Sequence, residues 1–244
     1  MEEMRTSEST RTLIRELGQR FSKKLGIDLE TGKSSEIFKW FFGSILFGAR
    51  ITEKIVVNTY REFETRNLLA PSKILERGWD GLVQVLDEGG YVRYDFKTAT
   101  KLLEVMGALE KRYKGDLNSL HEAASDPRDL EERLMSLGKG IGPVTVSIFL
   151  RELRGIWEKA DPMPRELVIE ASRNLGFTKL TGKDEKEKAL ILKRLKDVWR
   201  RSGIKEGSFI DLEAALVRMG RDFCRKKKCK TCPVRVRCEA PKSR

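Results

Sequence analysis

The sequence lacks any long hydrophobic segment and has few asparagines and glutamines and a single histidine. A membrane-spanning helix needs about 20 apolar residues in a row, but the best candidate, residues 37–49, is shorter and contains Lys39. The N-terminal residues MEEMRTSEST are polar and acidic, unlike a secretory signal. We therefore expect a cytoplasmic protein without membrane contacts. Abundant Lys, Glu and Arg beside so little Asn and Gln is typical of a thermophilic source.

The sequence also lacks the apolar–polar alternation of β-strands and any internal repeat. Apolar residues recur with helical spacing between glycine and proline breaks, which predicts an all-α fold. Asp95 and Asp211 are predicted N-caps, and Pro143 is predicted in the first turn of a helix, where a missing N–H costs nothing. We expect helices over residues 36–47, 52–65, 71–88, 95–113, 116–124, 129–137, 143–153, 165–175, 185–202 and 211–219.

Positive charge is in excess. Lys and Arg number 49 against 37 Asp and Glu, a net charge of +12. The 244 residues, 39% of them hydrophobic, suffice for one or two domains with a real core, and exclude a disordered or collagen-like chain. Because Lys and Arg displace counterions from phosphates, this balance favours a nucleic-acid partner.

Cysteines are absent from most of the chain and confined to its last 21 residues. Their spacing, C-x4-C-x2-C-x5-C, places four thiols in one short segment. Two disulfides would require an oxidising compartment, so we expect a metal centre. A [4Fe-4S] cluster and a zinc ion both accept four thiolates, and the spacing modestly favours the cluster. The predicted ligands are Cys224, Cys229, Cys232 and Cys238.

The cysteine segment is strongly basic. Residues 218–244 hold eleven basic side chains and two acidic ones, and Arg225, Lys226, Lys227 and Lys228 fill the gap between the first two cysteines. A metal centre would hold this loop in a fixed shape for binding phosphates. The same charge would also balance a negatively charged thiolate cluster.

A glycine-rich turn, Gly138–Gly142, joins two predicted helices. Gly140 and Gly142 permit positive φ angles and a close approach of the backbone to another chain. The N–H groups of the turn and of the next helix can bind one DNA phosphate irrespective of sequence. A purely structural turn between two helices is the alternative.

Taken in order, three motifs resemble the helix-hairpin-helix DNA glycosylase superfamily, in its iron–sulfur endonuclease III/MutY-like branch. LGKGIGPVT (Leu137–Thr145) is similar to the family hairpin, Asp161 follows at about the spacing of the catalytic aspartate, and Met219–Cys238 resembles the terminal cluster loop. Ser44–Tyr60 is a weaker fourth match. The first two cysteines are closer together here than is usual in the family.

The resemblance implies two helical domains with a DNA-binding cleft between them. Residues 35–155 would form a helical barrel that ends in the hairpin. Residues 1–34 and 156–244 would form the second domain, with the cluster loop at 219–238. The implied partner is double-stranded DNA with a damaged or mismatched base, bound by a monomer in the nucleoid.

The resemblance also assigns chemistry. Asp161 would stabilise the cationic sugar as the base leaves, although Asp before a proline is also a good helix N-cap. Bifunctional relatives carry a Schiff-base lysine at the position of Val144, so we expect a monofunctional glycosylase. A displaced lysine such as Lys139 would restore lyase chemistry. Arg50 occupies the place of a residue that inserts into the DNA stack. Expected DNA contacts are Arg50, Lys139, Gly140, Gly142, Val144, Thr145 and Arg225–Lys228.

Three functions therefore stay open from sequence. The first is the glycosylase, with the identity of its target base undetermined. The second is a non-catalytic iron–sulfur DNA-binding protein, which the missing lysine and the altered surroundings of Asp161 allow. The third is a zinc-bound basic module for nucleic acid.

Overall fold

The computed structural model describes residues 2–240, and side chains from residue 7 onward. Within these residues the fold is all-α, as predicted, and the one β feature is an isolated bridge between Arg154 and Trp157. No described helix is both long and apolar enough to cross a membrane. The chain divides into two compact units. We call Ser22–Pro162 the central unit, and the residues up to Phe21 together with those from Met163 onward the terminal unit.

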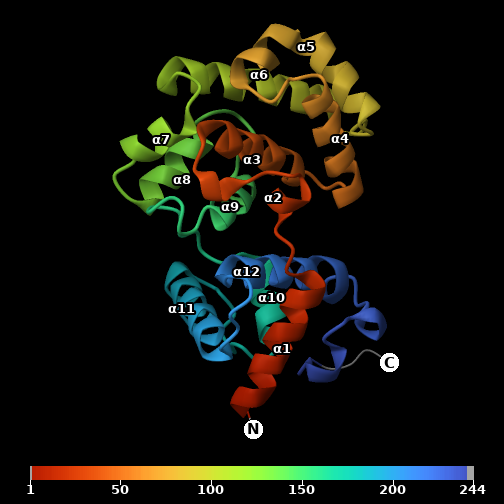
Figure 1. Cartoon of the computed structure of the whole chain (residues 1–244), viewed down its shortest axis with the longest axis vertical. Coiled ribbons are helices and arrows are strands. Elements are labelled where there is room, and N and C mark those ends of the chain that lie inside the picture. Colours follow the sequence, from red (N-terminus) through yellow and green to blue (C-terminus); the bar gives the residue numbers. More distant parts are fainter. Residues whose placement is uncertain (1, 241–244) are drawn as a thin grey trace. The chain divides into compact units, whose positions relative to one another are not determined.

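The central unit contains the hairpin. Its helices are α2 (Phe21–Lys24, which begins one residue before the unit), α3 (Ser34–Phe47), α4 (Glu53–Thr65), α5 (Pro71–Glu88), α6 (Asp95–Tyr113), α7 (Leu117–Ala123), α8 (Pro127–Met135) and α9 (Pro143–Glu152), with a 3-10 turn at Leu29–Thr31. Helices α5 and α6 lie side by side, and α3 packs against α9 (Figure 1).

The core of the central unit forms around aromatic side chains of α3, the most apolar helix. Trp40, Phe41 and Phe42 are fully buried. The Trp40 indole N–H donates to the Phe149 carbonyl on α9 at 3.0 Å, and the rings of Phe41 and Phe149 meet edge-on at 5.1 Å. The Phe42 ring lies 4.6 Å from that of Phe63 on α4. Because the rings of Trp40, Phe41 and Phe42 are fully buried, none of them has surface available to stack on a DNA base.

The terminal unit is built from both ends of the described chain. It contains α1 (Glu2–Leu17), α10 (Glu166–Asn174), α11 (Glu185–Ser202) and α12 (Phe209–Arg218), then short turns at Met219–Cys224, Cys229–Thr231 and Arg235–Arg237. Helix α1 packs against α11 and α12 (Figure 1). The core includes Leu13, Leu195 and Leu216, each fully buried.

Helix starts differ from the predictions by a few residues. Asp95 is the first residue of α6 rather than its N-cap. Ser208 caps α12, and Asp211 completes a capping box as its third residue. A capping box satisfies two of the free N–H groups at a helix start, whereas a single capping side chain satisfies one. This explains why α12 begins before Asp211. Pro143 opens α9 as predicted.

Candidate functional site

The glycine turn is fixed to helix α6. Gly140 has φ +94°, a value that side chains rarely adopt, whereas Gly142 has an ordinary extended φ of −109°. The Glu104 carboxylate on α6 accepts a hydrogen bond from the Lys139 backbone N–H at 2.8 Å. A β-carbon at Gly138 would lie 2.7 Å from Val105 on the same helix. The turn therefore has a fixed backbone and depends on glycine for its close packing.

Lys101 lies against the same turn, one helical turn before Glu104. A β-carbon at Gly140 would lie 2.8 Å from its Cε and 3.4 Å from its Nζ. Burial lowers the pKa of Lys101, and the charge of Lys97 adds to this effect. Sequence reasoning missed Lys101 because nothing in its local pattern links it to a turn almost 40 residues later.

The first turn of α9 contacts the end of α3. Thr145 is buried, and a β-carbon at Gly48 would lie only 2.5 Å from its Oγ1. Gly48 precedes the exposed Arg50 by two residues, so the structure brings the segment that carries Arg50 to the hairpin helix. Any contact of Thr145 with DNA would come from its backbone N–H, which lies in the unpaired first turn of the helix.

Val144 is an exposed apolar residue on the hairpin helix. The residue lies in the first turn of α9 and is 51% exposed, which is unusual for an apolar residue. Lys139 is exposed as well, on the other side of the two glycines. The hairpin thus presents one apolar side chain and one lysine to solvent.

Asp161 forms an ion pair with Arg154. Nη1 of Arg154 donates to Oδ1 of Asp161, and Nη2 donates to the Pro162 carbonyl at 2.5 Å. The Arg154 side chain is 8% exposed, but that of Asp161 is 42% exposed. Asp161 does not cap a helix, because α10 begins five residues later, at Glu166. The N-cap interpretation of Asp161 is therefore wrong.

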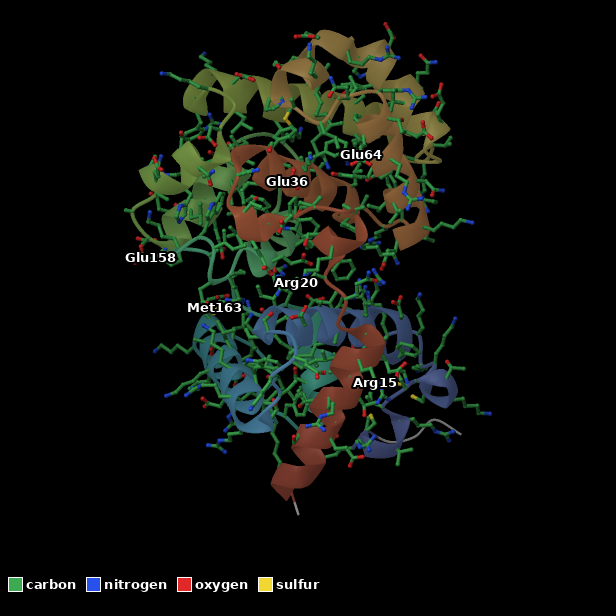
Figure 2. All side chains as sticks on the ribbon, in the orientation of Figure 1. Arg15, Arg20, Glu36, Glu64, Glu158 and Met163 are labelled. Atoms are coloured by element: carbon green, nitrogen blue, oxygen red, sulfur yellow. The ribbon has the colours of Figure 1, made fainter. Side chains whose placement is uncertain are left out.

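The loop between α9 and Asp161 is anchored by Trp157. The Trp157 ring stacks on the His121 imidazole at 4.7 Å with an interplanar angle of 11°, and meets Phe149 edge-on at 5.4 Å. Its indole N–H donates to the Asn118 side-chain oxygen at 2.8 Å. The next residue along this loop, Glu158, is labelled in Figure 2.

His121 is part of this anchor and stays close to a lysine. Lys159 Nζ donates to the His121 carbonyl at 2.9 Å. Burial lowers the pKa of His121, and the charge of Lys159 lowers it further, against weaker opposing effects of Glu122 and Glu158. The lowered pKa favours the neutral imidazole, and the histidine serves the structure of the loop by stacking on Trp157.

The hairpin and the Asp161 ion pair lie at opposite ends of α9. Gly142 precedes the first turn of this ten-residue helix, which is about 15 Å long. Arg154 follows its last turn. Nucleotides of one DNA strand are about 3.4 Å apart along the duplex axis. A single strand that reached both features would therefore contact them with different nucleotides.

All four cysteines lie in the terminal unit. Cys224, Cys232 and Cys238 pack against its core, and all four are partly exposed. The Cys238 thiol donates to the Asn174 carbonyl at the end of α10, at 3.2 Å. Within the described range, no three His, Cys, Asp or Glu side chains are arranged closely enough to hold a metal ion.

The donor chemistry nevertheless suits a metal centre. Burial raises the pKa of Cys224 to about 11, and the neighbouring Cys232 and Cys238 raise it further. Burial also raises the pKa of Cys232, with Cys238 and Cys229 adding to it. Each raised pKa reflects a cost of forming the thiolate, and a positive metal centre would remove that cost as it displaces the protons.

The basic loop of the cysteine segment faces solvent. Arg225, Lys226, Lys227 and Lys228 are all exposed. Lys227 has a positive φ of 52°, and the Lys228 N–H donates to the Phe223 carbonyl at 2.9 Å, which folds the loop into a tight turn. The cationic side chains thus extend from a compact backbone.

Comparison with known proteins shows a likeness of fold. No family model matches the chain, and no curated protein sequence is significantly similar to it. Among solved structures it resembles a thermostable thymine-DNA glycosylase, with a TM-score of 0.59 over 97% of this chain and 96% of the other. The sequence identity is 15%. The two proteins therefore share a helical fold along nearly their whole length.

Proposed function

We propose that this protein is a DNA glycosylase of base excision repair. The observation that carries the proposal is the exposed Asp161 carboxylate, at the end of the loop that follows the hairpin helix, in a chain with the fold of a thymine-DNA glycosylase throughout. The net charge of +12 supports DNA as the partner.

Asp161 is the residue that we assign to the chemistry. A glycosylase first extrudes its target base from the duplex, at a cost of a few kcal/mol. The bond between sugar and base then breaks with cationic character on the sugar, and a carboxylate beside it stabilises that charge and the attack of water. The 42% exposure of Asp161 leaves room for such a contact.

The hairpin is the proposed grip on the DNA backbone. The N–H groups of the first turn of α9, with the exposed Lys139 and the half-buried Lys101 beside Gly140, would form a positive site for a phosphate, while the Lys139 N–H is already bonded to Glu104. Arg50, on the segment that meets the start of α9, would fill the gap left by the extruded base. An Arg50→Ala variant with unchanged excision and unchanged lesion affinity would exclude that role.

We propose a monofunctional enzyme that leaves an abasic site. A covalent lyase step needs an amine that attacks the sugar, and Val144 has none. Lys139 is the alternative source of an amine on the hairpin. Strand cleavage without alkali would identify such a lysine.

We further propose that the four cysteines hold a [4Fe-4S] cluster, which would fix the basic loop for phosphate binding. Purified protein should then contain about four irons per chain and absorb in the visible range; zinc in their place would overturn the cluster. An Arg225→Ala/Lys227→Ala double variant should lower the slope of log affinity against log salt by up to about 2. Lys193→Ala/Arg194→Ala, on the exposed surface of α11, is the matched control.

The decisive experiment is base release from a panel of duplexes, each with one modified or mismatched base. The panel includes thymine and uracil opposite guanine, oxidised guanine, adenine opposite oxidised guanine, and an alkylated purine. Each duplex is incubated with wild-type protein or Asp161→Asn, then divided between hot alkali and neutral buffer. We expect alkali-dependent cleavage of one duplex and at least a hundredfold slower release by the variant.

A second function has one observation in its favour. The guanidinium of Arg154 neutralises much of the Asp161 charge, which suits a protein that binds altered DNA without cutting it. Such a protein would release no base from any duplex, yet would bind one of them more tightly than undamaged DNA. Asp161→Asn would then leave that preference unchanged.

A further inference from the structure

Arg154 makes two contacts at the Asp161 site, and they differ in kind. One guanidinium nitrogen donates to the Asp161 carboxylate and the other to the carbonyl of the next residue, Pro162. Arginine has a planar fork with five N–H donors, whereas lysine presents a single flexible ammonium group. One side chain therefore holds both the carboxylate and the backbone that carries it.

Arg154 and Asp161 differ in burial, which indicates different roles for the two side chains. The Arg154 side chain is 8% exposed and Asp161 is 42% exposed. A phosphate or base can reach the carboxylate, but the guanidinium has almost no surface to offer a ligand. Arg154 is therefore suited to act on a bound nucleotide by holding Asp161 rather than by direct contact.

The rest of the loop limits its movement at a second point. Trp157, midway between the two residues, is held by its stacking on His121 and by its hydrogen bond to Asn118. The segment after Trp157 has no helix until Glu166. The stretch from Trp157 to Pro162 is not part of a helix, so helical hydrogen bonds do not fix its backbone. Arg154 holds the C-terminal end of this stretch through Asp161 and Pro162.

We infer that Arg154 is a positioning residue for the proposed reaction: it fixes the direction of the Asp161 carboxylate toward the sugar of the extruded nucleotide. This inference rests on the proposed function. It predicts that loss of Arg154 slows the chemical step and leaves DNA binding intact, because misplacing a reacting group by about 1 Å can cost a hundredfold in rate.

The test uses the full-length protein in four forms: wild type, Arg154→Met, Arg154→Lys and Asp161→Asn. Single-turnover rates are measured at saturating protein on the panel duplex that the wild type cleaves fastest. Affinity is measured with a duplex that contains a tetrahydrofuran abasic analogue, and thermal melting shows that each form is folded. Arg133→Met, which removes an arginine–aspartate pair on α8 of the same unit, is the control.

We expect Arg154→Met to slow base release at least thirtyfold, with affinity for the abasic analogue within threefold of wild type. Arg154→Lys keeps the charge but not the fork, and should recover less than a tenth of the wild-type rate. Arg133→Met should stay within threefold of wild type. If Arg154→Met does not fold, the Arg154→Lys rate and affinity decide the question alone.

Two other results would overturn the inference in distinguishable ways. Near wild-type rates for both Arg154 variants, beside an inactive Asp161→Asn, would show that the carboxylate needs no positioning by Arg154 and would leave the proposed function intact. No base release by wild type from any duplex would remove the proposed function and this inference together.

Discussion

Arg154 and Asp161, seven residues apart, form an ion pair in which the arginine is buried and the aspartate is exposed. A local reading of the chain assigns Asp161 to a helix N-cap, because Pro162 follows it. In the structure the Asp161 carboxylate pairs with the Arg154 side chain instead, and this contact lies at the end of the loop. An exposed carboxylate on a fixed loop can act on a ligand, whereas a cap is occupied by the N–H groups of its helix.

The two hairpin glycines should respond differently to alanine. Gly140→Ala puts a side chain at φ +94° and against Lys101, and should lower the free energy of unfolding by about 1–3 kcal/mol. Gly142 has an extended φ and no atom within 4 Å of a β-carbon, so Gly142→Ala should cost less than about 1 kcal/mol, which reflects its place as the N-cap of α9. Chemical denaturation of both variants checks this. Weaker DNA binding by Gly142→Ala alone would show that DNA approaches the backbone there, and equal stability losses would contradict the prediction.

Lys101 should contact a phosphate at the hairpin. Lys101→Met should weaken binding to any duplex and reduce the slope of log affinity against log salt by about 1, because one fewer counterion is released. Lys97→Met, on the exposed surface of α6 one turn earlier, is the matched control. A salt titration of binding to undamaged duplex gives both slopes. Equal slopes for wild type and Lys101→Met would exclude the contact.

A lysine at position 144 should create lyase chemistry. The side chain at this position is 51% exposed at the start of the hairpin helix, so an amine there can reach DNA. Val144→Lys should form a covalent complex with an abasic duplex that borohydride traps at least tenfold faster than with wild type. Val144→Met, of similar length and without an amine, controls for the change of shape. Trapping of wild type at the same rate would instead identify another lysine, and Lys139→Met would test the first candidate.

Acid should destabilise the loop through His121. The pKa of His121 is lowered in the folded protein, chiefly by burial, so the unfolded chain binds the proton more tightly. This contribution to stability is complete above about pH 6.5, the ordinary histidine pKa, and is lost as the pH falls below it. His121→Phe keeps a ring on Trp157 without a titrating group. Its melting temperature should fall less than that of wild type between about pH 7.5 and 5. Parallel curves would show that His121 titrates as in the unfolded chain.

Some features could be predicted because they depend on neighbours in sequence. Helical spacing of apolar residues predicted the all-α class, and Pro143 was placed correctly in the first turn of its helix. The start of α12 is harder to predict from sequence, since Asp211 and Ser208 are both good capping residues. Their mutual hydrogen bonds decide which is the cap. Helix α1 escaped prediction, because its N-terminal sequence is polar and its packing on α11 and α12 is a tertiary contact.

The features of the candidate site also fall into two classes, those that the sequence predicts and those that depend on packing. Residue types and their spacing along the chain suffice to predict the positive charge, the four clustered cysteines, the glycine turn and the missing amine at Val144. The contacts of Lys101 with Gly140, of Gly48 with Thr145 and of Arg154 with Asp161 become visible in the folded chain alone. These contacts depend on how helices and loops pack, and a side chain's local pattern does not specify which distant residue it will meet.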